Sequence, residues 1–219
     1  MEFIIADANK KDLCFLDEGA SLDFDVGASD DFQISIALDS YDPEAHIEGN
    51  ILYCIGTEYG GIFNDPEIST KERKKTLTGD TFRGMLKKKY IEPASGQDYK
   101  TISGELNACI AQLMNSAFSN TLFRVSSAST GVSVSGFQFD RYCSLLDGIN
   151  KMLASKDFRL SIKAVRVEDD FFIELAAKPL VDYSEDIEFS QDNDVNFKIK
   201  RVTNKYNYMI CLLYTSDAA

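Results

Sequence analysis

The chain has 219 residues, of which 44% are hydrophobic and 26% are charged, enough for one substantial core or two small ones. Its formal net charge of −12 repels nucleic acid and argues against ordinary DNA binding. No apolar run approaches the roughly 20 residues that span a bilayer, and the N-terminus lacks signal-peptide features, so we expect no membrane insertion and folding in a cytoplasm.

The first 55 residues predict antiparallel strands. Residues 22–26 and 32–38 alternate apolar with polar or small side chains, which places one face of each strand in a core. Gly27–Asp30 supplies the turn of a hairpin between them. A loop over 41–49 carries the sole histidine, His46, which we expect to be exposed, and 51–55 is the next strand. Short strands at this spacing favour an antiparallel barrel or sandwich.

Residues 56–93 predict a strand–loop–strand–helix corner. A double glycine permits unusual backbone angles or the close approach of another segment. Thr81 is the expected cap of a basic helix that Pro93 stops, and the lysines of its last turn suit the negative end of the helix dipole. The simpler interpretation is that these lysines are solvated at the helix end. The more specific interpretation is that they contact an acidic neighbour.

The corner also holds a polar cluster around Glu58. We expect Glu58 to be a structural hydrogen-bonding group in a tight corner rather than a catalytic acid, because no partner carboxylate can be located from spacing. The candidate structural or interface residues of the corner are Glu58, Tyr59, Gly60, Gly61, Phe82, Arg83, Lys87, Lys88 and Lys89.

Residues 94–182 change in character and predict a smaller α+β unit. Ser103 is the expected cap of a helix to Phe118, and residues 139–154 form a second amphipathic helix. The Ser/Gly/Thr-rich stretch 126–136 is expected to be an exposed loop. Strands over 158–164 and 171–177 make a hairpin.

Two further strands, 197–202 and 208–212, have no partner nearby and are expected to pair back into the first sheet. The predicted fold is therefore α+β and β-rich. A β-barrel-like domain (1–93 plus 183–212) is interrupted by an inserted α+β domain (94–182). The last stretch, 213–219, resembles the translation of a sequencing-adapter remnant, so we expect it to be non-native and the natural protein to continue.

The motifs for chemistry are incomplete. Gly79–Gly84 has the spacing of a phosphate-binding loop, but Met85 and Leu86 replace the required Lys-Ser/Thr. Residues 192–197 begin like a calcium loop and then lack its glycine and final glutamate. The five cysteines are odd in number and widely spaced, which argues against disulfides and a zinc site. We therefore expect no catalytic, cofactor-binding or metal-binding residues.

Several segments together resemble siphophage tail-hub or baseplate proteins of phages that infect Gram-positive bacteria. The resemblance rests on Gly56–Ile62, Gly79–Leu86, Ile91–Pro93 and Gly96–Tyr99, with further similarity at 21–32 and 207–212. Members of that family carry a tryptophan near the position of Phe82, whereas this chain has no tryptophan, which marks it as divergent.

The resemblance implies two barrel-like domains, the first completed by strands that follow the second. It also implies a homotrimer whose ring closes the tail tube and lets DNA pass without binding it specifically. The implied partners are the distal tail, tape-measure and tail-fibre proteins, and the implied location is the virion tail, assembled in the host cytoplasm.

Two alternatives stay open. The chain could be the anchoring N-terminal part of a tail-associated cell-wall hydrolase whose catalytic domain is missing, or a receptor-binding module. No activity is expected within this segment itself.

Overall fold

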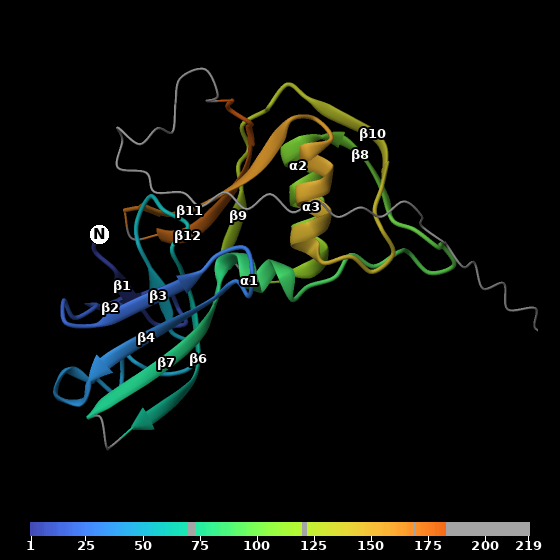
Figure 1. Ribbon diagram of the computed structural model, residues 1–219. Coiled ribbons are helices and arrows are strands. Elements are labelled where there is room, and N and C mark those ends of the chain that lie inside the picture. The colour runs from blue at the N-terminus through green and yellow to red at the C-terminus, as the bar shows by residue number, and fades with distance from the viewer. Residues whose placement is uncertain (70–72, 120–121, 169, 183–219) are drawn as a thin grey trace, which may run out of the picture. The chain divides into compact units, whose positions relative to one another are not determined.

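The structure is a computed structural model that describes residues 1–69, 73–119, 122–168 and 170–182 (Figure 1). Met1–Leu180 forms one compact unit. Its elements confirm the prediction of a β-rich α+β chain, because strands outnumber helices and most of the strand pairs are antiparallel.

The largest sheet is built from the first 81 residues. Its strands in spatial order are β2 (Asp12–Phe15), β1 (Ile4–Ala6), β5 (Ile51–Tyr53), β6 (Gly60–Ser69), β7 (Lys74–Thr81), β4 (Asp31–Ala37) and β3 (Ser21–Asp25). The predicted hairpin is confirmed, since β3 pairs with β4 and sets Phe24 opposite Phe32. A short 3-10 helix, η1 (Leu38–Ser40), follows β4.

This sheet rolls up but does not close into a barrel within the described residues, which differs from the predicted barrel-like domain. In the described part of the chain, β2 and β3 each have one neighbouring strand, and residues 16–20 link them without ladder pairing. The roll still brings Phe3 within 5.8 Å of Phe24, measured between ring centroids. The strands expected to complete the domain, 197–202 and 208–212, lie outside the described residues, so the proposed domain division stays a prediction.

Two hydrophobic clusters hold the unit together. The first lies within the rolled sheet and is formed by the inward side chains of its strands, among them Phe32, Ile34, Leu52 and Phe63. The second is larger and packs helices against the sheets. Burying apolar surface on this scale is the main source of stability for such a fold, at about 25 cal/mol per Å².

Three helices contribute to the larger cluster: α1 (Phe82–Lys87), α2 (Leu106–Ala117) and α3 (Leu145–Ala154). Beside them lie a two-stranded sheet of β8 (Thr101–Glu105) and β10 (Ser133–Gln138), and a three-stranded sheet of β11 (Phe158–Val167), β12 (Asp170–Pro179) and β9 (Phe123–Val125). The predicted hairpin over 158–177 is confirmed as β11 and β12. In Figure 1, α1 follows directly from β7.

Three predicted boundaries in this region are wrong. Ser103 does not cap a helix, because it lies in β8 and its hydroxyl accepts from the Gly136 amide; the cap of α2 is Glu105. The expected loop 126–136 contains the start of β10. The second helix begins only at Leu145, where the Ser144 hydroxyl accepts from the Asp147 amide.

Candidate functional site

The corner that carries the family resemblance is fixed where β7 passes into α1. Thr81 caps the helix as predicted, since its hydroxyl accepts from the Gly84 amide at 3.1 Å. The same hydroxyl donates to the carbonyl of Asp30 at 2.7 Å, and the Thr81 amide donates to that carbonyl at 3.1 Å. A residue 51 positions earlier in the chain therefore sets the start of α1.

Asp30 is the central residue of this junction, whereas the sequence predicts it only as part of the hairpin turn Gly27–Asp30. Its side chain is buried, and its backbone is left-handed with φ 60°. One carboxylate oxygen accepts from the Gly27 amide at 2.8 Å and the other from Lys87 Nζ at 3.0 Å. The hydrogen bond that Lys87 donates to Asp30 raises the pKa of Lys87 above its usual value.

The predicted basic helix end is divided among different partners. Lys87 also donates to the Ala28 carbonyl at 2.6 Å, and Lys88 Nζ lies 2.6 and 2.7 Å from the two carboxylate oxygens of Asp80. Lys89 instead lies over the ring of Phe118, 5.4 Å from its centroid. All three lysines thus contact groups of the chain itself, which weakens the expectation that the run contacts an acidic neighbour as a unit.

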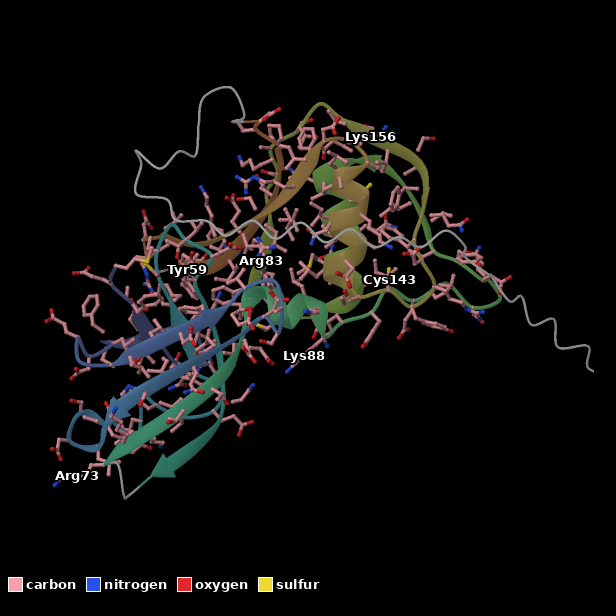
Figure 2. The ribbon with its side chains drawn as sticks, in the orientation of Figure 1. Tyr59, Arg73, Arg83, Lys88, Cys143 and Lys156 are labelled. Carbon is pink, nitrogen blue, oxygen red and sulfur yellow. The ribbon has the colours of Figure 1, made fainter. Side chains whose placement is uncertain are left out.

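Glu58 and Arg83 form a partly buried ion pair across the corner. Oε2 of Glu58 accepts from Nε of Arg83 at 2.7 Å and also lies 2.7 Å from Nη2. Tyr59 packs its ring 5.5 Å from that of Phe24 and stays partly exposed; Figure 2 labels Tyr59 and Arg83. This geometry supports the interpretation of Glu58 as a structural group, because its carboxylate is held by a cation and joins the turn between β5 and β6 to α1.

The double glycine allows close approach of neighbouring strands. A Cβ built on Gly61 would lie 1.9 Å from the Asp80 carbonyl oxygen, and one on Gly60 would lie 2.4 Å from the Leu52 carbonyl oxygen. Phe82 is fully buried beneath them and meets Phe123 edge to face at 6.5 Å. Side chains at both glycine positions would therefore force the backbone of β5 or β7 away.

His46 is buried, so its predicted exposure is wrong. Its Nδ1 lies 3.0 Å from both the amide and the carbonyl of Asp42, and its ring stacks on Tyr41. Within the part of the chain that the structure describes, its buried Nε2 has no hydrogen-bond partner. Burial lowers the pKa of His46, since the charged imidazolium would lose its hydration there.

A second polar cluster, also missed from the sequence, ties the large sheet to β11. The Tyr53 hydroxyl donates to Asp12 at 2.7 Å, and Nη2 of Arg166 contacts both Asp12 and that hydroxyl. Burial raises the pKa of Tyr53 to about 12, so its phenol stays protonated at physiological pH. The aromatic ring stacks on Phe171 at 4.0 Å. These contacts are typical of a structural interface between packed sheets.

The comparisons add no family assignment. Neither the protein-family models nor the curated proteins that were searched match this chain. Across the described ranges, no group of three His, Cys, Asp or Glu side chains is placed to hold a metal ion. Likewise, none of the helices there is long and apolar enough to cross a bilayer.

Proposed function

We propose that the chain is a structural component of a siphophage tail tip, a tail-hub or baseplate protein that forms a ring around the exit of the tail tube and lets DNA pass. The observation that carries this proposal is that the residues of the resembling segments have structural roles. Gly60 and Gly61 fit between backbones, Phe82 fills the core, and Glu58 pairs with Arg83. Residues that resemble the hub family thus serve architecture here.

The rolled sheet supports the proposal that the first domain has a barrel-like hub fold. Its two edges approach closely enough for Phe3 and Phe24 to stack at 5.8 Å, which is the curvature a small barrel requires. The net charge of −12 fits a passage that DNA crosses without being retained, because retention needs cations that displace its counterions. The proposed partners are two further copies of the chain and the neighbouring tail proteins.

The test is the mass of the full chain in solution. Size-exclusion chromatography with light scattering at micromolar concentration should give three times the chain mass of 24.5 kDa, and electron microscopy should show rings. The measurement is repeated at low and at high salt, because repulsion between acidic copies is screened at high ionic strength. A monomer or a dimer under both conditions would contradict the hub proposal.

A further inference from the structure

A groove lies beside the two edge strands of the rolled sheet, β2 and β3. It has a volume of about 500 Å³ and lies between the start of the chain, the end of β2 and the start of β3. Phe3, Leu16 and Leu22 line it and also pack on the core of the sheet. Phe15 lines it with 67% of its surface exposed, so the groove offers an apolar floor that is not fully covered.

Two edge strands of the sheet border the groove, because Phe15 ends β2 and Leu22 lies in β3. In the described chain β2 pairs only with β1, and β3 pairs only with β4, so each strand has one side without a ladder partner. Backbone amides and carbonyls on such edges form a template for an added strand. An extended peptide could pair with an edge while alternate side chains enter the apolar floor.

The charge around the groove indicates which kind of added strand would bind there. Glu2, Asp17 and Glu18 line its rim. Furthermore, residues 12–70 contain fourteen Asp and Glu residues and no Lys or Arg. A hydrogen bond from Ser40 and one from the Gly19 amide lower the pKa of Asp17, which keeps this carboxylate ionised. Edge pairing between two copies would bring like charges together, which disfavours a second copy as the occupant.

We propose that this groove binds an extended segment of a partner protein in which apolar and basic side chains alternate. The segment adds a strand at the edge of β2 or β3, places its apolar side chains against Phe3, Leu16 and Leu22, and directs its Lys or Arg side chains to the acidic rim. This proposal does not depend on the tail-tip function, because it rests on the sheet edges and their charge. It requires that the strands expected over 197–202 and 208–212 do not pair with these two edges.

The probe is a short fluorescent peptide that alternates Val and Lys, compared with a Val and Glu peptide of equal length. Anisotropy with the full chain should show binding of the Val/Lys peptide, weakening as salt is raised, and at least tenfold weaker binding of the Val/Glu peptide. Hydrogen exchange should show protection concentrated in β2 and β3 on binding. Absent binding, equal binding of both peptides, or protection confined to other elements would overturn the proposal.

Charge-reversal variants locate the site. E2K/E18K should weaken Val/Lys binding roughly tenfold, because two exposed ion pairs become repulsive. E92K/E168K makes the same change in net charge at two exposed glutamates away from the groove and should alter binding less than threefold. Phe15→Ser removes an exposed apolar wall with little risk to folding and should weaken binding severalfold. Equal losses in the two double variants, or no loss in Phe15→Ser, would refute the groove as the site.

Discussion

Replacing Asp30 tests whether the junction of β7 and α1 depends on this residue. Asp30→Ala removes the carboxylate that accepts from the Gly27 amide, a charge-assisted bond whose loss costs about 1.5–3 kcal/mol at a buried site. Alanine at a φ of 60° adds about 1 kcal/mol of backbone strain. The bonds from Thr81 survive, since they end on the backbone carbonyl.

The expected loss in the free energy of unfolding is therefore about 3 kcal/mol, which lowers the melting temperature by roughly 6–12 °C for a unit of this size. Asp30→Asn should cost only about 1 kcal/mol, because asparagine tolerates the left-handed region and keeps an oxygen acceptor for Gly27. Asp31→Ala is the matched control. Asp31 is exposed and accepts one bond from Ser29, so its loss should change stability by less than about 0.5 kcal/mol.

Urea unfolding followed by far-ultraviolet circular dichroism measures all three variants, and tyrosine fluorescence provides a second probe because the chain lacks tryptophan. The ranking Asp30→Ala, then Asp30→Asn, then Asp31→Ala is the prediction. If Asp30→Ala were as stable as Asp31→Ala, the buried carboxylate would not fix the corner. If Asp30→Asn were as damaging as Asp30→Ala, the charge rather than the backbone geometry would dominate.

Two further predictions concern His46 and the double glycine. The folded pKa of His46 lies below its ordinary value of 6.5, so the unfolded chain binds more protons and stability should fall as pH drops below about 6.5. His46→Asn should flatten the urea midpoint against pH between about 7 and 5.5, and an unchanged slope would exclude His46 as its source. Gly61→Ala should cost about 2–4 kcal/mol because its Cβ would overlap the Asp80 carbonyl, whereas Gly19→Ala meets only the Asp17 side chain and should be nearly neutral; equal urea midpoints would contradict this.

Local sequence patterns predicted the strands and helices that are determined by their own side chains. Alternation predicted β3 and β4, and Thr81 marked the start of α1, because these signals come from the side chains of the element itself. Ser103 misled because serine is a common helix cap, while its actual partner, Gly136, comes from a strand 33 residues away. Short strands such as β2 also escaped, since four residues show too little alternation.

The burial of His46 could not be predicted either, because it depends on residues far away in the sequence. Its loop is polar and contains a proline, which is typical of exposed segments. The tertiary fold nevertheless places the imidazole against Tyr41, whose ring also receives the buried Lys75 at 3.6 Å. Nothing in the local sequence predicts that a lysine 29 residues later closes this site.

The three lysines at the end of α1 show why a charged run is a poor guide to a surface. Lys87 is the last residue of α1, Lys88 is its C-cap and Lys89 follows the helix. Lys87 contacts Asp30, Lys88 contacts Asp80 and Lys89 lies over the ring of Phe118. The expectation of one basic contact surface treated the lysines as a unit, whereas the structure gives each a different partner.

Acidic and basic residues are also unevenly distributed along the sequence, which the net charge does not show. Residues 12–70 hold no Lys or Arg, whereas residues 73–100 hold eight basic and three acidic residues. Within one copy, however, Arg73 pairs with Asp39, Arg83 with Glu58 and Lys87 with Asp30, so the basic stretch already neutralises carboxylates of the acidic stretch. The distribution of charge along the sequence therefore does not choose between a ring and a twofold dimer. The mass in solution makes that choice directly, because it distinguishes a trimer from a dimer.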